Sequence, residues 1–482
     1  MNQMTRRGFL AGSAAAGAGI MFSTSSRAQG ANDDIRIAVI GFNSQGGSHI
    51  NGFKKMKGVR LVALCDADQK VIDKRVAELA KDDIKVETTQ DMRRIFDRKD
   101  IDAISTATPN HWHALTSIWA IQSGKDVYVE KPVSHNVWEG RKIVEAARKY
   151  GRIVQTGTQK RSSLGNKAAF EYMQSGQLGK ILWARGFCYK RRDNIGKTEG
   201  PQPIPASVDY DLWCGPAPKE ELRRKKLHYD WHWVWPTGNG DIGNQGIHEM
   251  DLCRWALGEK AIAPRVMSFG GRFGYEDDAT TPNTQVAVFD YEKAPLIFEV
   301  RGLPSTPGDR TPMDAYRGIR VGIVVQCEGG YFAGGENGGW IFDNDHKRMK
   351  QFTQSGAAEH KQNFIDAVRA RKQELLTADI EEGHLSSALC HMGNVSYRLG
   401  RETSPEQAME QVKSNKEAVD SLERMKSHLA ANNVNIEKHF PTVGPSLAMN
   451  TKAERFEGPM ADKANELLTR NYREPFVVPD KV

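Results

Sequence analysis

The sequence has few of the features that mark disulfide-rich, zinc-binding, membrane-spanning or nucleic-acid-binding proteins. Its six cysteines are scattered over 482 residues without a Cys-x-x-Cys pair, which indicates neither a disulfide framework nor a zinc site and leaves open only an isolated bridge. Beyond the N-terminal region, no segment approaches the roughly 20 apolar residues of a membrane-spanning helix. The net charge of +7 falls to +4 without Arg6, Arg7 and Arg27, so charge gives no reason to expect a nucleic-acid partner.

Apolar residues are abundant enough for large cores, which excludes a chain that is disordered throughout. Hydrophobic residues make up 39% of the sequence and aromatic residues 8%, including ten tryptophans. At about 100 to 200 residues per domain, the length indicates two or three domains. The sequence shows neither internal repeats nor low-complexity blocks.

The first 28 residues have the three parts of an export signal. The run Thr-Arg-Arg-Gly-Phe-Leu at 5–10 is similar to a twin-arginine motif, an apolar stretch follows at 11–22, and Ser-Arg-Ala at 26–28 suits signal peptidase. We therefore expect a twin-arginine signal over 1–28 and a mature protein that begins at Gln29 in the periplasm or beyond. A signal retained as an anchor, or a cytoplasmic protein with a chance Arg-Arg pair, is the alternative.

Residues 34–157 alternate short β-branched runs with amphipathic stretches, which is typical of a parallel sheet covered by helices. The pattern predicts a doubly wound α/β domain of the Rossmann type over 34–157. Strands are expected at 35–40, 60–65, 102–106, 126–129 and 152–156, and helices near 47–56, 69–81, 90–97, 112–123 and 137–150.

The order of predicted elements changes after residue 158, where strand-like runs follow one another with little helix between them. This pattern predicts a second, substrate-binding α+β domain over 158–431 with an open, largely antiparallel sheet. We expect the remaining tail, 432–482, to pack back on the body. Strands are expected near 181–189, 263–273, 284–291, 295–301 and 318–327, and helices near 166–175, 358–371, 380–399 and 405–431.

The first predicted strand ends in a glycine turn that is typical of nucleotide-binding domains. Gly41, Asn43 and Gly46 occupy the glycine positions of Gly-x-Gly-x-x-Gly, with asparagine in the middle. Asp66 ends the second strand, where a carboxylate accepts hydrogen bonds from an adenosine ribose and repels a 2′-phosphate. The pattern therefore favours NAD over NADP. A glycine turn without a ligand, with Asp66 capping the next helix, is the alternative.

Two further motifs follow predicted Rossmann strands, whose carboxyl ends face the ligand crevice, and a third lies in the second domain. The three motifs are Thr108-Pro109-Asn110 with His113, Glu130-Lys131-Pro132, and His248-Glu249-Met250-Asp251. Together with the glycine turn, they resemble the glucose–fructose oxidoreductase, inositol dehydrogenase and MocA family, written Gfo/Idh/MocA. The resemblance is strong over about 34–157 and looser to about 400.

The resemblance implies an NAD(P)-dependent oxidoreductase that acts on a hydroxyl carbon of a sugar or polyol. Lys131 is then the catalytic lysine and His248 its partner, and the glycine turn with the first two motifs binds the cofactor. Independently, burial near a cationic nicotinamide lowers the pKa of a lysine toward a value that suits it to take a hydroxyl proton. A solvated surface lysine is the alternative. Many relatives have an Asp four residues before the histidine, whereas this chain has Asn244, which cannot exchange a proton but could position a hydroxyl.

Other polar and aromatic residues are candidates for contacts with a saccharide, because sugars combine apolar faces with a rim of hydroxyls. Asp251 lies one turn after His248 on a helix predicted over 245–257, and Arg161 follows the last Rossmann strand. A packed aromatic core, solvated charges and an Asp bonded to a neighbouring loop are the alternatives. No metal site is expected. The candidate substrate contacts are Asn244, Asp251, Tyr189, Trp231 and Arg161.

These features together predict an exported, NAD-binding sugar or cyclitol oxidoreductase with its substrate between the two domains. The periplasm supplies no free nicotinamide cofactor, so we expect NAD to be held tightly. One alternative is a glycosidase of the same family, which oxidises a ring hydroxyl transiently, eliminates the aglycone and restores the starting oxidation state. A non-catalytic saccharide-binding protein is the other. Whether the protein forms a homo-oligomer is left open.

Overall fold

The computed structural model describes residues 34–482, of which 35–482 form one compact unit. The predicted export signal lies outside the described residues. Among the residues from 34 onward, no helix has both the length and the apolar character needed to cross a membrane.

The N-terminal part is a six-stranded parallel sheet with the strand order β3-β2-β1-β4-β5-β6. Both faces of its central strands are buried, which is why these strands are continuous apolar runs in the sequence. In β1, Ala38 and Ile40 face one core and Ile37 and Val39 face the other. The predicted Rossmann-type fold is confirmed. The strands are β1 (Ile35–Ile40), β2 (Val59–Cys65), β3 (Glu87–Thr89), β4 (Ala103–Thr106), β5 (Asp126–Val129) and β6 (Val154–Thr156).

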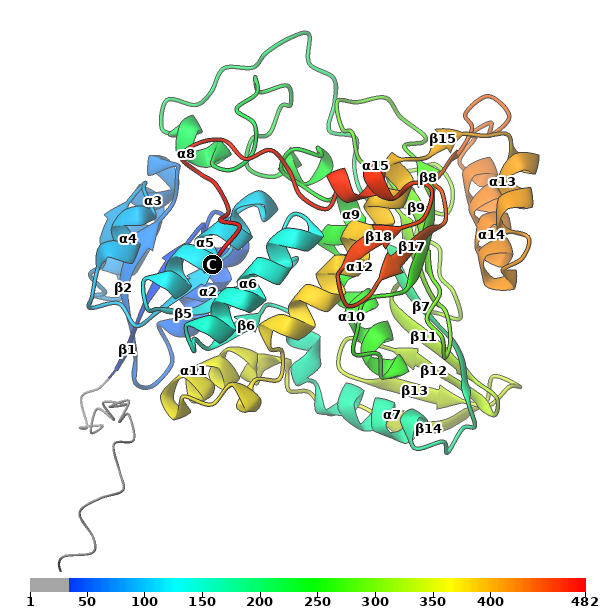
Figure 1. The fold of residues 1–482 in the computed structure, drawn as a ribbon, viewed down its shortest axis with the longest axis horizontal. Helices are drawn as coiled ribbons and strands as arrows, with labels where there is room; N and C mark the ends of the chain where they lie inside the picture. Colours follow the sequence, from blue (N-terminus) through cyan, green and yellow to red (C-terminus); the bar gives the residue numbers. More distant parts are fainter. Residues whose placement is uncertain (1–33) are drawn as a thin grey trace, which may run out of the picture. The chain divides into compact units, whose positions relative to one another are not determined.

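Helices cover both faces of this sheet (Figure 1). One core includes side chains of α5 and α6, and the other includes side chains of α2, α3 and, from much later in the chain, α11 (His360–Ala370). Asp68 and Asn136 cap α3 and α6 by accepting hydrogen bonds from backbone amides of the first turn. The other helices of this part are α2 (Gln45–Phe53), α3 (Gln69–Ala80), α4 (Arg93–Asp97), α5 (Asn110–Gln122) and α6 (Val137–Lys149).

The second part is built on a 12-stranded mixed sheet. Its ladders are antiparallel except for β10 against β7, so the predicted open, largely antiparallel sheet is confirmed. The main strand order is β14-β13-β12-β11-β7-β10-β9-β8-β16-β15, with β17 and β18 beside β8. The strands are β7 (Ile181–Tyr189), β8 (Arg265–Gly271), β9 (Thr284–Phe289), β10 (Leu296–Arg301), β11 (Val321–Cys327), β12 (Gly330–Gly334), β13 (Gly339–Phe342), β14 (Arg348–Phe352), β15 (Arg401–Glu402), β16 (Thr442–Val443), β17 (Leu447–Asn450) and β18 (Arg455–Glu457).

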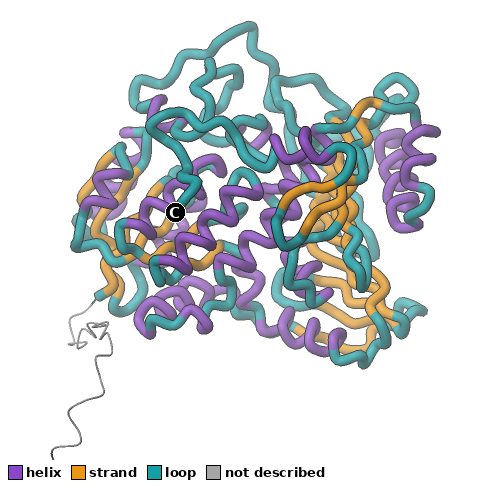
Figure 2. Tube along the Cα trace, in the orientation of Figure 1, coloured by secondary structure: helices purple, strands orange, loops and turns teal. Residues whose placement is uncertain are grey.

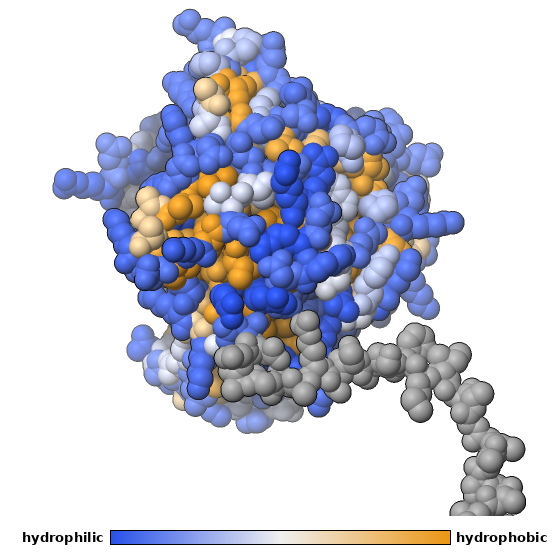
Figure 3. All heavy atoms as spheres, turned by 90° about the vertical axis from the view of Figure 1, so that its left-hand side faces the viewer, coloured by the Kyte–Doolittle hydropathy of each residue, from blue (hydrophilic) through white to orange (hydrophobic). Residues whose placement is uncertain are grey.

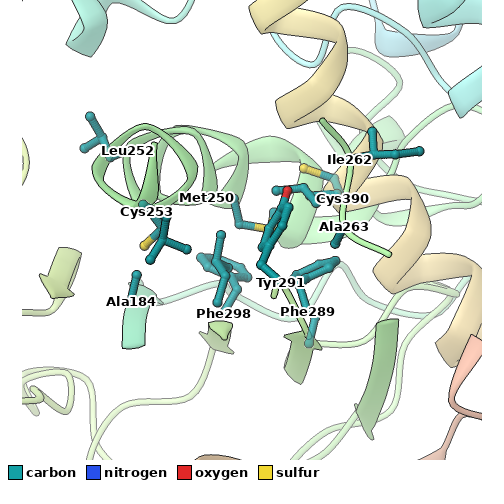
Figure 4. Packing of buried hydrophobic residues seen from close by; sticks show 14 of the residues in the cluster. Ala184, Met250, Leu252, Cys253, Ile262, Ala263, Phe289, Tyr291, Phe298 and Cys390 are labelled. Atoms are coloured by element: carbon teal, nitrogen blue, oxygen red, sulfur yellow. The ribbon is translucent and has the colours of Figure 1, made fainter. Parts of the chain in front are cut away.

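One face of this sheet packs against α10 (Gly246–Leu257) and α12 (Ile380–Arg398). Figure 4 shows Met250 and Cys253 of α10 over Phe298 of β10 and Ala184 of β7. α7 (Leu164–Gln174) also contributes to this core, while α13 (Pro405–Val412) and α14 (Lys416–Ala431) contribute to the core on the other face. The burial of α10 explains how the His-Glu-Met-Asp motif is held in place.

The structure differs from the sequence-based expectation in two places. The helix expected over 405–431 is divided into α13 (Pro405–Val412) and α14 (Lys416–Ala431), because Asn415 caps a new helix by accepting bonds from Glu417 and Ala418 amides. The sequence pattern also missed β3 and the strands β12 to β14. These strands are short, and β12 and β13 contain glycines that interrupt the apolar pattern.

The C-terminal tail forms β16 to β18 and α15 (Ala461–Glu466) and then returns to the N-terminal part as an extended loop (Figure 2). Its Phe476 packs with Trp112 and Trp119 of α5. The tail therefore joins the two parts of the compact unit.

Figure 3 shows that the face on the N-terminal side is mostly hydrophilic, with groups of hydrophobic side chains between the polar ones.

Candidate active site

A cavity of about 430 Å³ lies where the carboxyl ends of β1, β2, β4 and β5 meet α9 (Gly240–Asn244) and the start of α10. Segments far apart in the sequence contribute to its wall, including η2 (Asp230–Trp233) with the two residues before it, and the C-terminal tail. Most of the candidate residues lie along it. Those are Gly41, Asn43, Asp66, Thr108, Pro109, Asn110, His113, Glu130, Lys131, Trp231, Asn244 and His248.

The glycine turn leaves room at one end of the cavity. Gly41 has a φ of +73°, which an L side chain rarely adopts, and a Cβ atom there would lie 2.7 Å from the Thr108 amide nitrogen. Gly46 lies behind the turn, where a Cβ atom would lie 2.0 Å from the Gly41 carbonyl oxygen. Gly46 thus allows α2 to approach the turn, and the N-terminal amides of α2 are placed for an anion.

The Asp66 carboxylate is fixed at the end of β2 by two backbone amides. One oxygen accepts a hydrogen bond from the Phe42 amide at 3.0 Å, and the other accepts one from the Asp68 amide at 3.1 Å. Burial raises the pKa of Asp66, an effect that these two bonds oppose. The carboxylate thus lies beside the glycine turn, in the position expected for a ribose contact.

Glu130 lines the cavity, and three neighbouring groups donate hydrogen bonds to it. Its carboxylate accepts hydrogen bonds from His49 Nε2 at 3.0 Å, Gln45 Nε2 at 3.2 Å and the Lys131 amide at 3.2 Å. Burial disfavours the charged form, but the His49 bond and the Lys131 charge outweigh it, so the pKa of Glu130 is lowered. Gly157 is required here, since a Cβ atom would lie 2.9 Å from this carboxylate.

His113 joins the two loops that carry the other motifs. Its Nδ1 lies 2.6 Å from the Pro132 carbonyl oxygen and its Nε2 lies 2.8 Å from that of Thr108. Asn110 makes a similar link to the second part, because its amide donates to Asn239 Oδ1 at 2.9 Å. These bonds hold the loops after β4 and β5 at fixed positions in the cavity wall.

Lys131 follows β5 and reaches across to the second part. Its Nζ donates a hydrogen bond to the backbone carbonyl oxygen of Asn244 at 2.9 Å. Burial lowers the pKa of Lys131, and the Lys190 charge adds to this effect against the carboxylates of Glu130 and Glu249. A lysine in this environment is easier to deprotonate than a solvated one.

His248 lies in the first turn of α10 and lines the same cavity. It is buried, and its Nδ1 has no hydrogen-bond partner among the described residues. Burial and the charges of Lys131 and Lys160 lower the pKa of His248 well below its ordinary value. The neutral imidazole can therefore exchange a hydrogen bond with a ligand.

Three candidate substrate contacts do not line the cavity. Arg161 Nε donates to both carboxylate oxygens of Asp251 at 2.9 Å, and Ser386 also donates to Asp251. Tyr189 faces the opposite core of the second sheet, where its hydroxyl donates to Glu299 at 2.7 Å. We therefore do not propose Arg161, Asp251 or Tyr189 as substrate contacts.

Several wall residues come from irregular segments for which sequence periodicity gave no signal. Trp231 stacks on His232 at 3.6 Å between ring centroids, and Trp213 and Phe476 add further aromatic surface. Phe476 lies in an apolar run between two prolines, Pro-Phe-Val-Val-Pro at 475–479. This run is the sequence feature from which burial of Phe476 could have been predicted. Lys190 and Arg192 also line the cavity, and Arg192 pairs with Asp241 at 2.6 Å.

Two family models match the chain. The model described as the oxidoreductase family NAD-binding Rossmann fold matches residues 35–158, and that of the oxidoreductase family C-terminal alpha/beta domain matches residues 173–296. Together these spans are more than half of the chain. The chain belongs to the Gfo/Idh/MocA oxidoreductase family. Membership confirms the predicted family and the oxidoreductase class.

Curated relatives match a smaller part of this family member. A glycosyl hydrolase family 109 protein of Shewanella sp. (strain W3-18-1) is 39% identical over 120 residues, which are 24% of this chain and 26% of the relative. An alpha-N-acetylgalactosaminidase of Shewanella oneidensis is 36% identical over 118 residues, 23% of this chain and 26% of the relative. The chain thus spans about a quarter of the length of these relatives.

Solved structures of other proteins share the fold over most of the chain. The WlbA dehydrogenase from Bordetella pertussis, in complex with NADH and UDP-GlcNAcA, has a TM-score of 0.55 at 18% identity, covering 74% of this chain and 94% of its own. The aldose-aldose oxidoreductase from Caulobacter crescentus, complexed with glycerol, has a TM-score of 0.54 at 14% identity, covering 75% and 97%. At these identities the likeness shows the fold alone.

The described residues contain no group of three or more His, Cys, Asp or Glu side chains arranged to hold a metal ion. All six cysteines are buried and free in the structure.

Proposed function

We propose that the protein is an NAD-dependent oxidoreductase that acts on a hydroxyl carbon of a sugar, glycoside or cyclitol. The observation that supports this most strongly is the composition of one cavity. The glycine turn and Asp66 line one part of the wall, and Lys131 and His248 line another. A nucleotide and a small hydroxylated substrate would therefore lie against the same set of fixed groups.

The residues at the nucleotide end fit NAD. The space beside Gly41 admits a phosphate backbone that a side chain would obstruct, and the amides of α2 suit its charge. Asp66 would accept bonds from the adenosine ribose and repel the 2′-phosphate of NADP. When bound, NAD supplies the acceptor for the hydride that leaves the carbinol carbon.

Lys131 would take the hydroxyl proton as the carbinol becomes a carbonyl. Its lowered pKa favours the neutral amine that this step requires. His248 would hold the same hydroxyl or its neighbour through a ring nitrogen. Asn244, whose carbonyl oxygen binds Lys131 Nζ, would position a second hydroxyl with its side-chain amide.

We also propose that NAD stays bound between turnovers. Phe476 from the tail and Trp213 from the short helix α8 (Tyr210–Cys214) line the cavity, so cofactor exchange would require these segments to move. A protein exported through the twin-arginine pathway would carry its cofactor with it. A second substrate, or a later step of the same cycle, would then restore the cofactor's oxidation state.

Mass spectrometry of the small molecules released on denaturation tests the cofactor assignment. Protein purified without added nucleotide is expected to release NAD(H). Recovery of NADP(H) instead would contradict the role of Asp66. Single-turnover reduction of the bound cofactor by a panel of sugars and cyclitols then identifies the substrate class.

A glycosidase is the second candidate, and the names of the curated relatives favour it. Transient oxidation of a ring hydroxyl acidifies the adjacent C–H bond, which permits elimination of the aglycone, addition of water and reduction back to the sugar. The net reaction is hydrolysis, and a neutral His248 suits removal of the C–H proton. Aglycone release from nitrophenyl glycosides without any added acceptor would select this candidate over net oxidoreduction.

A further inference from the structure

A second opening lies outside the active-site cavity and shares none of its lining residues. It is a groove of about 660 Å³ between α12, the loop at 235–239 and the tail that follows α15. We call it the Arg398 groove. The residues used below are Arg398, Arg470, Trp235, His391, Asn394 and Asn471.

The groove holds two guanidinium groups that form no ion pair within residues 34–482. The guanidinium of Arg398, at the end of α12, makes no hydrogen bond there either, and it lies 5.3 Å from the centroid of the Trp235 ring. Arg470 donates to the Pro236 carbonyl oxygen at 2.7 Å and to His135 Nδ1 at 3.4 Å, which leaves part of its fork unused. Arg398 is exposed and Arg470 is half-buried, so both guanidiniums are accessible from the groove, and no ion pair within residues 34–482 competes for an incoming anion.

Acidic groups near the groove offset this pair only in part, since the Glu139 charge opposes the lowering of the Arg470 pKa by burial but forms no ion pair with it. Glu139 lies close to Arg470, but its carboxylate accepts bonds from the His135 amide, the Asn136 side chain and the Tyr472 hydroxyl. Glu466 lines the groove and is exposed without an ion pair. The surrounding protein and the Arg470 charge both lower the pKa of Arg398, a repulsion that a bound anion would relieve.

A buried side chain with an unused polar atom lies in the same wall. His391 is 4% exposed, its Nε2 lies 3.3 Å from Ser134 Oγ, and its Nδ1 has no partner among the described residues. Burial lowers the pKa of His391 to about 3, so the ring is neutral at physiological pH. The neutral His391 ring therefore adds no charge to the groove wall.

We propose that the Arg398 groove binds a saccharide that carries a carboxylate or sulfate group. The two guanidiniums would hold the acidic group, while the amides of Asn394 and Asn471 would meet ring hydroxyls. The partly exposed Trp235 indole offers an apolar surface for the sugar's C–H face. The groove is also much larger than an inorganic ion needs.

The groove and the active-site cavity share a wall at Asn239. Its Oδ1 accepts a bond from Asn110, which lines the cavity, and its backbone oxygen accepts one from Asn394, which lines the groove. The groove site is nevertheless argued from its own residues. It does not depend on the reaction proposed for the cavity.

Calorimetric titration of the full-length protein with its cofactor tests the proposal, with glucuronate, glucose and sulfate as probes. Glucuronate is expected to bind more tightly than glucose or sulfate, and Arg398→Gln is expected to weaken it about tenfold or more through loss of a charge-assisted bond. Arg348→Gln is the matched control, because Arg348 also lies over a tryptophan ring, at 4.8 Å from Trp340, outside the groove. Binding in the active-site cavity would not respond to Arg398.

A second measurement needs no variant. Glucuronate should protect Arg398 and Arg470 of the wild-type protein from phenylglyoxal, read by peptide mass spectrometry, and should leave Arg348 reactive. Absent glucuronate binding, equal affinity for glucose, sulfate binding as tight as glucuronate, or equal effects of the Arg398 and Arg348 substitutions would each overturn the proposal.

Discussion

Lys131 Nζ donates a hydrogen bond to the backbone carbonyl oxygen of Asn244 at 2.9 Å, joining the loop after β5 to the end of α9. The bond fixes the lysine relative to both parts of the molecule. A carbonyl oxygen accepts a bond from the neutral amine as well as from the ammonium group, so the contact survives deprotonation. The geometry therefore suits a group that alternates between the two states.

Replacing Lys131 with alanine should leave the cofactor bound and slow the chemical step by roughly 10²- to 10⁴-fold, as for a lost general base. Single-turnover reduction of bound NAD measures this step directly. Lys125→Met is a matched control, because Lys125 is also buried and donates to a backbone carbonyl, that of Arg98 at 2.8 Å, but lies outside the cavity. Equal rates for wild type and Lys131→Ala would remove this lysine from the mechanism.

The rate of that step should rise with pH, because only the neutral amine accepts the hydroxyl proton. Burial lowers the pKa of Lys131, so the midpoint should fall below the ordinary value of 10.5. Between the two pKa values the unfolded chain binds more protons than the folded one, so the contribution of Lys131 to stability also rises with pH there. The assignment would be contradicted if the wild-type rate did not rise with pH, or if Lys131→Ala showed the same rise.

Asp66→Ala should weaken NAD binding and reduce the preference for NAD over NADP. The substitution removes both the acceptor for the ribose hydroxyls and the negative charge that repels a 2′-phosphate. Titration with both nucleotides measures the ratio of dissociation constants. Asp68→Asn serves as the control, since Asp68 pairs with His228 at 2.8 Å and does not line the cavity. An unchanged ratio in Asp66→Ala would exclude Asp66 as the discriminating group.

The sequence predicted the architecture because periodicity reports burial directly. β1 is apolar at successive positions since helices cover both faces, and the spacing from Gly46 to Asp66 follows from one helix and one strand. Tyr189 shows that periodicity predicts a strand but not which of its side chains faces a ligand. Side chains alternate along β7, so Tyr189 faces the core with Phe187, whereas the next residue, Lys190, lines the cavity. A shift of one residue thus decides which side chain meets a ligand.

Long-range ion pairs and irregular segments were equally beyond sequence reasoning. Arg161 and Asp251 were both expected near the substrate, and the structure pairs them with each other at 2.9 Å. A buried charge needs a partner, and the pair supplies one. Trp213 and Phe476 come from stretches with no period, so only the folded chain places them over the Rossmann strands.

Arg6→Lys together with Arg7→Lys should leave folded, cofactor-loaded precursor in the cytoplasm if residues 1–28 are a twin-arginine signal. Fractionation followed by immunoblotting measures the distribution. Arg27→Lys is the control within the same segment, because it keeps the arginine pair. Unchanged periplasmic recovery of the double variant would refute the predicted route of export.

Phe476→Ala should speed the release of NAD about tenfold, because the ring covers part of the cavity and its removal exposes the bound cofactor to water. The substitution should also cost about 3 to 5 kcal/mol of stability, as buried Phe→Ala changes do.

Phe456→Ala separates the two effects. Phe456 lies in β18 of the same tail and is also 2% exposed, but it packs in the core of the second part. Both variants should lower the melting temperature, and only Phe476→Ala should raise the dissociation rate of NAD in a stopped-flow chase. Equal dissociation rates in the two variants would show that the tail stabilises the fold without retaining the cofactor.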